Sequence, residues 1–202
     1  MNKEQSKFYV PKVKFYEPER NLPGRIPRVI TTEARFTIQF ARSYMSNFKG
    51  IHHRTNKDRI TCTRQLSMNG FGIADLISVS WNSNLMNFIH VDDFILNAKP
   101  TVRAFEIKLS NWRRGMSQAH RYRYFADASI LVLPMNIIEN ALKYLETFRK
   151  IKVGLWAFDM ELKRIKPYYT PRPSHAFELK YKRQALQIAS HTNKALPIVR
   201  KD

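Results

Sequence analysis

The residues of this chain that are best suited to chemistry are charged side chains inside apolar, strand-like segments. Asp75 lies within residues 72–80, and Glu106 and Lys108 lie within residues 102–110. Side chains two positions apart share a face of a strand, so Glu106 and Lys108 are predicted to point the same way. An ionised group in such a segment costs several kcal/mol unless a metal or a partner compensates it. Pairing the two strands would bring both carboxylates within reach of one Mg²⁺ ion.

The pattern acid–x–Lys is by itself a weak signal. It occurs at Glu106–Lys108, Glu161–Lys163 and Glu178–Lys180, about the frequency that a charged chain gives by chance. Only the first occurrence lies in an apolar strand that follows an acid-bearing strand, and the other two are interpreted as solvated surface charges. A structural alternative stays open, in which Glu106 and Lys108 form an exposed ion pair and Asp75 caps a bulge.

Taken together, these segments resemble the PD-(D/E)XK, or restriction-endonuclease-like, nuclease superfamily over residues 31–134. Asp75 matches the first acid of the motif, Glu106 the second acid, and Lys108 the lysine. Ala74 stands where the family usually has a proline. The resemblance implies an α/β fold with an αβββαβ core, in which helices flank a mixed central sheet.

Two further elements extend the resemblance. Gln118 and Tyr122 are similar to the Gln-x-x-x-Tyr element of the RecB-like exonucleases. Glu33 is similar to the additional first-helix glutamate of the Holliday-junction resolvase branch. An acid is also favoured in the first turn of any helix that Thr31 or Thr32 caps, so Glu33 has an equally simple structural explanation.

The resemblance implies a nuclease that hydrolyses phosphodiester bonds in DNA with Mg²⁺, for which Mn²⁺ would substitute; RNA stays open as a substrate. Asp75, Glu106 and the carbonyl of Ile107 would hold the ion, and Lys108 would orient or deprotonate the attacking water. Gln118 would position the phosphate or the water, with Tyr122 supporting that geometry. Two alternatives are a non-catalytic nucleic-acid-binding subunit and an assembly factor of a defence system or mobile element.

Charge and composition agree with a nucleic-acid partner. The chain has 202 residues, a net charge of +19 and a pI near 10.3, and such an excess of cations attracts polyanions. A membrane surface is the second choice of partner. The single cysteine, Cys62, fits a reducing compartment, and the sequence has neither an apolar leader nor a membrane span. We therefore expect a cytoplasmic protein, with a homodimer left open.

The elements that must position these residues follow from periodicity and turn signals. Residues 1–30 are expected to form an extended basic arm, 31–170 the nuclease-like domain, and 171–202 a basic helical extension. Within the domain we expect helices at 32–48, 111–126 (with Ser110 as N-cap) and 136–150, and strands at 59–66, 72–80, 102–110, 129–133, 153–158 and 162–169. A long connection is expected between residues 81 and 100.

Candidate phosphate contacts come from two basic segments. Arg114 and Arg121 lie on the helix that follows Lys108, and helical spacing places them with Gln118 along one flank beside the proposed site; Arg113 of the same helix is a further candidate. The C-terminal helix is expected to extend the basic surface with Lys180, Lys182 and Arg183.

Overall fold

The computed structural model describes residues 31–52, 58–82, 88–193 and 196–198. Within these residues the chain forms an α/β structure built on one mixed six-stranded sheet, whose strands lie in sequence order. The predicted N-terminal arm, residues 1–30, lies outside the described residues. The strands are β1 (Asp58–Met68), β2 (Gly72–Asn82), β3 (Thr101–Ile107), β4 (Ala128–Pro134), β5 (Val153–Asp159) and β6 (Arg164–Tyr169).

The sheet combines antiparallel and parallel pairs. β1, β2 and β3 are antiparallel neighbours, β3, β4 and β5 are parallel, and β6 returns antiparallel to β5. The β1–β2 hairpin turns through Gly70, whose φ of 81° suits glycine. The parallel β3–β4 step requires a crossover, and helix α3 (Trp112–Arg121) supplies it.

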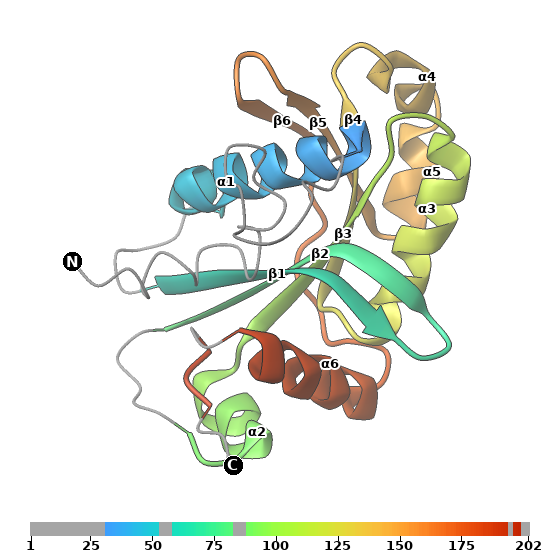
Figure 1. The fold of residues 1–202 in the computed structure, drawn as a ribbon. Coiled ribbons are helices and arrows are strands. Elements are labelled where there is room, and N and C mark those ends of the chain that lie inside the picture. Colours follow the sequence, from blue (N-terminus) through green and yellow to red (C-terminus); the bar gives the residue numbers. More distant parts are fainter. Residues whose placement is uncertain (1–30, 53–57, 83–87, 194–195, 199–202) are drawn as a thin grey trace, which may run out of the picture.

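Helices cover both faces of the sheet (Figure 1). α1 (Thr32–His52) packs its buried aromatic side chains, including Phe40 and Tyr44, on one face against Phe105 and Trp156. The opposite face is covered by α3, α4 (Ile138–Leu142), α5 (Leu145–Lys150) and α6 (Leu179–Thr192). In the connection between β2 and β3, the structure has a short helix, α2 (Val91–Asp93), followed by a π-helical turn, η3 (Phe94–Ala98).

The expected C-terminal extension is part of the core. Ala185, Leu186 and Ala189 of α6 are buried in the same apolar cluster as Ile77 of β2 and Ala104 of β3. At the end of α6, the amide of Asn193 donates to Thr61 and to the Cys62 carbonyl of β1. α6 therefore packs on the sheet as part of its apolar core and is not a separate extension.

Two helix predictions were wrong in detail. Asn111, not Ser110, caps α3: its φ is 43° and its side chain accepts from the Arg114 N–H at 3.4 Å. Asparagine tolerates this left-handed conformation better than most residues. The α-helix ends at Arg121 and continues as a 3₁₀ turn, η4 (Tyr122–Tyr124), which the periodicity of the apolar residues did not reveal.

The predicted single helix over residues 136–150 is two helices. The break falls at Lys143 and Tyr144, between α4 and α5. Tyr144 has non-helical backbone angles, and its ring packs on Trp112 at a centroid distance of 5.0 Å. A contact with α3 therefore accompanies the break in an otherwise helical sequence pattern.

Candidate active site

The candidate site begins where β2 and β3 separate. Pairing between these strands runs from Ser80–Thr101 to Leu76–Phe105 and stops there, although both strands continue. Beyond the last pair, the Ile107 N–H donates to the side chain of Asp75, with 2.8 Å from the nitrogen to Oδ2. A carboxylate thus takes the place of a backbone acceptor at the mouth of the fork.

Asp75 and Glu106 lie close together at this fork. Asp75 accepts the N–H of Ile107, the residue after Glu106. The two carboxylates are also close enough for the charge of Glu106 to raise the pKa of Asp75. The structure therefore brings the two predicted acids together.

Glu106 is 1% exposed and has a protein partner at each oxygen. Oε1 lies 2.6 Å from Lys108 Nζ, and Oε2 lies 2.5 Å from the hydroxyl of Tyr122. The same hydroxyl lies 2.7 Å from the carbonyl oxygen of Ile73, so its single hydrogen faces two acceptors. The predicted common direction of Glu106 and Lys108 is seen directly in their ion pair.

The stem of Lys108 is held by close approach of α3. A Cβ placed on Gly115 would lie 2.7 Å from Lys108 Cγ and 2.6 Å from Leu131 Cδ1, so only glycine fits without a shift. The ammonium group also lies 3.8 Å from a carboxylate oxygen of Glu33, in the first turn of α1. α1 and α3, on opposite faces of the sheet, thus both contribute to the position of Lys108.

The acidic groups of the site are short of positive charge. Burial, together with the neighbouring charge of Glu106, raises the pKa of Asp75 to about 7, against the lowering effects of the Ile107 N–H and Lys108. The charge of Glu33 adds to the rise. At neutral pH the site can therefore gain a proton or a further cation at little electrostatic cost.

Lys108 and Tyr122 keep their protons in this environment. Burial would lower the pKa of Lys108, but the hydrogen bond and charge of Glu106, with Asp75 and Glu33, hold it above its ordinary value. Burial and the charge of Glu106 raise the pKa of Tyr122 far above the usual range for a phenol. In the metal-free site Lys108 is therefore an ammonium group and Tyr122 a neutral hydrogen-bond donor.

Gln118 of α3 lies between Gly115 of the same helix and Tyr122 of η4, the two residues that contact the site. It is one turn from Gly115, which touches Lys108, and one turn from Tyr122, which binds Glu106, so the three residues form a stripe on the helix. Its side-chain oxygen is buried and has no hydrogen-bond partner among the described residues. A buried amide oxygen without a partner is costly, and a water or a ligand would satisfy it.

The donor set suits a hard divalent cation, although the site is small. The described residues contain no group of three or more His, Cys, Asp or Glu side chains arranged to hold a metal ion. Two buried carboxylates beside one lysine nevertheless provide the oxygen ligands that Mg²⁺ prefers, and this ion commonly keeps several waters. The role of the Ile107 carbonyl as a ligand of the ion stays a prediction. In the structure Ile107 contributes to the site through its N–H, which donates to Asp75.

The predicted arginines of α3 are exposed, but they differ in their contacts. Arg113 lies over the ring of Trp112, 4.5 Å from its centroid, and donates to the Tyr144 hydroxyl at 3.0 Å. Arg114 and Arg121 are exposed, and the charge of Arg121 acts on Tyr122. Arg121 is therefore the cation of this group with a described link to the site.

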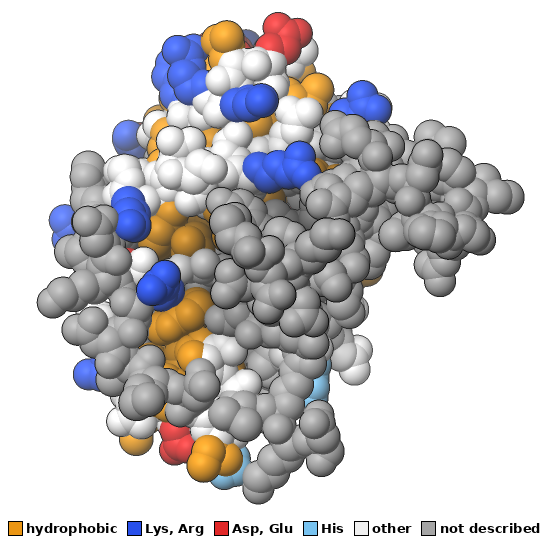
Figure 2. Space-filling view, turned by 60° about the vertical axis from the view of Figure 1, so that its left-hand side comes forward, with side chains coloured by type: hydrophobic (Ala, Val, Ile, Leu, Met, Phe, Trp, Pro, Cys, Tyr) orange, Lys and Arg blue, Asp and Glu red, His pale blue; other side chains and the backbone are white. Residues whose placement is uncertain are grey.

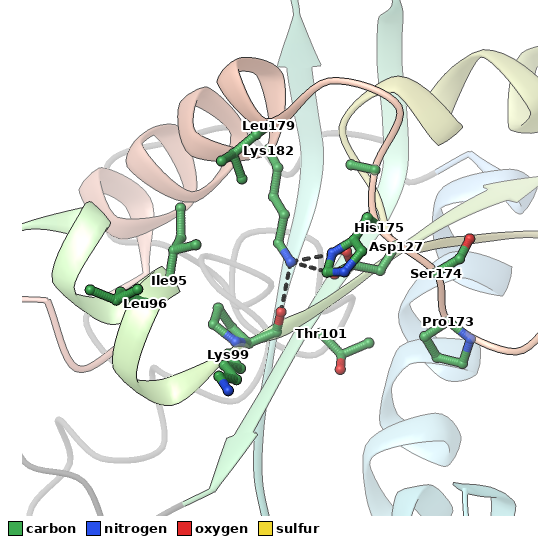
Figure 3. A pocket seen from close by; sticks show the side chains of 12 residues that line it. Ile95, Leu96, Lys99, Thr101, Asp127, Pro173, Ser174, His175, Leu179 and Lys182 are labelled. Carbon is green, nitrogen blue, oxygen red and sulfur yellow. Dashed lines mark hydrogen bonds and ion pairs between the residues drawn. The ribbon is translucent and has the colours of Figure 1, made fainter.

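The expectation for Lys182 was wrong. Its side chain is buried, and its ammonium group binds both oxygens of Asp127, at 2.9 and 2.8 Å, and the Pro100 carbonyl at 2.9 Å (Figure 3). The amphipathic spacing predicted that Lys182 lies on the basic surface. In the structure its side chain instead points into the protein and pairs with the buried acid Asp127. Lys180 is exposed as predicted, and Arg183 forms an exposed ion pair with Asp92.

A pocket of about 840 Å³ surrounds this buried pair rather than the acidic site. It is lined by residues from η3, the start of β3 and the loop before α6, including Lys99, Thr101 and His175 (Figure 3). Thr101 and Glu106 lie at opposite ends of β3, about 16 Å apart along a strand. This pocket and the acidic site are therefore separate features.

The surface carries the basic charge in a dispersed form. Figure 2 shows Lys and Arg side chains spread over the described part of one face, with hydrophobic side chains between them and few acidic ones. In the part of the chain that the structure describes, no helix has the length and apolar character needed to cross a bilayer.

Comparison of the sequence with family models and with curated proteins finds no match. Function must therefore be inferred from the geometry of the site. Sequence reasoning missed Gly115 and the bond between Ile107 and Asp75. The spacing Gly115, Gln118, Tyr122 along one helical face was the available signal for the glycine, because a small residue there allows close helix–strand contact.

Proposed function

We propose that this protein is a metal-dependent nuclease of the PD-(D/E)XK type that hydrolyses phosphodiester bonds in DNA. The observation that carries the proposal is the convergence of Asp75, Glu106 and Lys108 at the point where β2 and β3 separate. The order of α1, β1, β2, β3, α3 and β4 supports the proposal, because an αβββαβ order is expected of that superfamily; α2 and η3 lie between β2 and β3. That the core is restriction-endonuclease-like is itself part of the proposal.

Asp75 and Glu106 would hold Mg²⁺, with Mn²⁺ as a substitute and the Ile107 carbonyl as a third ligand. When bound, such an ion polarises the scissile phosphate and lowers the pKa of a water. The pKa of Asp75 near 7 supports this assignment, because burial and the charge of Glu106 disfavour ionised Asp75 in the metal-free site by more than Lys108 and the Ile107 N–H offset.

The other residues of the site act on the phosphate and on the carboxylates. The Lys108 ammonium group would leave Glu106 for the phosphate, where it offsets the negative charge that develops during attack. Tyr122 donates to Glu106 and fixes the direction of that carboxylate. The unpartnered side-chain oxygen of Gln118 would accept a hydrogen bond from the attacking water and so orient that water.

One observation favours the second candidate, a non-catalytic nucleic-acid-binding subunit. Both oxygens of Glu106 already have protein partners, Lys108 and Tyr122, so the acid is satisfied as a structural residue. In this account the ion pair stabilises the fork between β2 and β3, and exposed cations such as Arg121 bind nucleic acid without cleavage.

A cleavage panel separates the two candidates. Plasmid, branched DNA, single-stranded DNA and RNA are incubated with the protein in Mg²⁺ or Mn²⁺, using wild type, Glu106→Gln and Asp75→Asn. The matched control is Glu161→Gln, which alters an exposed acid–x–Lys pattern at the β5–β6 hairpin. We expect cleavage by wild type and Glu161→Gln and none by the site variants. Binding without cleavage by the wild type under all conditions would favour the binding subunit, and cleavage by Glu106→Gln equal to that of wild type would show that Glu106 is not part of a catalytic site.

A further inference from the structure

A row of aromatic side chains connects the β1–β2 turn with η4, α6 and the loop before α6. Phe71, in the β1–β2 turn, stacks with Tyr124 of η4 at a centroid distance of 5.2 Å and meets Tyr181 of α6 at 4.7 Å. Tyr124 in turn contacts Phe177, in the loop before α6, at 5.4 Å. His120 of α3 lies 6.5 Å from Phe177 and ends the row.

Part of this row faces solvent. Phe177 is 53% exposed and Tyr124 is 40% exposed. Phe71 has a structural role, because its contacts with Phe125 and with Tyr181 of α6 pack the β1–β2 hairpin against these elements. Packing of that kind does not account for the exposure of Phe177 and Tyr124, whose rings present open surface next to one another.

The row adjoins the acidic site through the backbone. Tyr122, which binds Glu106, is two residues before Tyr124, and its hydroxyl contacts the carbonyl of Ile73, two residues after Phe71. Short segments of the β1–β2 hairpin and of η4 therefore connect residues of the row with residues of the site.

Cations accompany the rings. Lys180 Nζ lies 4.8 Å from the centroid of the Tyr181 ring, and the exposed Arg121 follows His120 in the chain. The guanidinium group of Arg123 lies 5.2 Å from the Phe177 centroid, but it is buried and donates to Asp127 and Ser174, so it holds the ring and does not face a ligand. Glu178, next to Phe177, is the acid nearest in sequence to the rings. Exposed aromatic rings interleaved with cations are the combination that binds single strands.

We propose that Phe177 and Tyr124 stack unpaired bases of a nucleic acid strand whose backbone reaches the candidate site, so that the preferred substrate has a single-stranded segment. The position of the cut rests on the proposed nuclease function, whereas the stacking itself does not. Every base has a π-face, so the platform selects unpaired strands rather than a sequence. The net charge of +19 favours this polyanionic occupant over an apolar protein surface.

Binding is tested without cleavage, in EDTA. Affinity for a dT oligonucleotide and for a duplex of equal length is measured for wild type, Phe177→Ala and Tyr124→Ala. Removing one stacking ring should weaken single-strand binding about 5- to 100-fold and change duplex binding little. Phe177→Trp, which keeps an aromatic ring, should retain the single-strand affinity that Phe177→Ala loses. An oligonucleotide containing 2-aminopurine should lose fluorescence on binding to wild type and keep it with Phe177→Ala.

Tyr144→Ala is the matched control, since Tyr144 is 42% exposed but packs on Trp112, away from the row. Circular dichroism checks that each variant folds. Unchanged single-strand affinity in Phe177→Ala and Tyr124→Ala, or an equal reduction in Tyr144→Ala, overturns the proposal. Ring variants that keep single-strand binding but no longer bind a protein partner would assign the rings to a protein interface instead. Failure of cleavage in every metal, with the binding defects present, would remove the nuclease function and leave the platform.

Discussion

The N–H of Ile107 donates to Asp75 across the fork between β2 and β3, with a nitrogen-to-oxygen distance of 2.8 Å. This bond holds the carboxylate of Asp75 beside Glu106 even though both are acidic. Repulsion between the two acids is thus built into the folded state, and it gives the first predictions a definite sign.

The stability of the metal-free protein should depend on pH through Asp75. Its pKa is raised to about 7 in the folded state from an ordinary value near 3.8, so the folded state binds a proton more tightly than the unfolded chain. This contribution to stability is full below about pH 4 and is lost as pH rises to about 7. Asp75→Asn keeps a side-chain acceptor for Ile107 and removes the charge. At pH 8 it should be more stable than wild type by about 1–3 kcal/mol, as measured by urea unfolding.

The control for this experiment is Asp159→Asn, at the β5–β6 turn, where the carboxylate also accepts backbone N–H bonds. It should leave the stability difference between pH 5 and pH 8 as in wild type. A stability difference that is the same in Asp75→Asn and wild type would show that Asp75 is not a buried group under charge repulsion.

Divalent cations should stabilise the protein more strongly as pH rises. Asp75 must be ionised to bind an ion, so the increase in Tm on adding Mn²⁺ should grow between pH 6 and pH 8. Asp75→Asn and Glu106→Gln should lose this increase, and Glu161→Gln should keep it. A pH-independent increase that survives in both site variants would place the bound ion elsewhere.

Lys108→Met should abolish cleavage and spare metal binding. The variant removes the cation that pairs with Glu106 at 2.6 Å, so the carboxylates are freer to bind Mn²⁺ while the phosphate loses its positive partner. Calorimetry should give a metal affinity equal to that of wild type or higher. A decrease in metal affinity as large as the decrease in turnover would make Lys108 a structural residue.

Gly115→Ala should disturb the site by displacing the stem of Lys108. The added methyl group would overlap Lys108 Cγ and Leu131 Cδ1, so the helix or these side chains must move. We expect a loss of stability of about 1–3 kcal/mol together with reduced cleavage, measured by unfolding and turnover. Gly50→Ala is the matched control, because nothing lies within 4 Å of the position of its Cβ; a stability loss as large as that of Gly115→Ala would contradict this account.

Salt dependence should separate exposed cations from the buried one. Changing Arg114 and Arg121 together to Gln should reduce the slope of duplex affinity against salt by about 0.9 for each phosphate that these side chains neutralise in wild type. Lys182→Gln should leave that slope unchanged and destabilise the fold instead, because it removes the cation that lies between 2.8 and 2.9 Å from Asp127. An altered slope in Lys182→Gln would contradict its buried position.

Local patterns in the sequence determined much of this structure. Side-chain alternation predicted that Glu106 and Lys108 point the same way, because that relation depends only on local extended backbone geometry. Their ion pair agrees with it, although Lys108 lies one residue beyond the end of β3. Helical spacing likewise predicted that Tyr122 and Ala119 lie on the buried side of α3, and both are buried. The α/β class and the order of most elements follow from the same short-range periodicities.

Tertiary contacts decided the rest. The fork after Leu76 and Phe105 depends on how three strands pair, and the burial of Lys182 depends on Asp127, far away in sequence. Tyr144 leaves the helical conformation where it meets Trp112. In each case the stabilising free energy comes from contact with a partner that is distant in sequence. Local sequence does not specify that partner, so only the assembled sheet and helices fix the position of these residues.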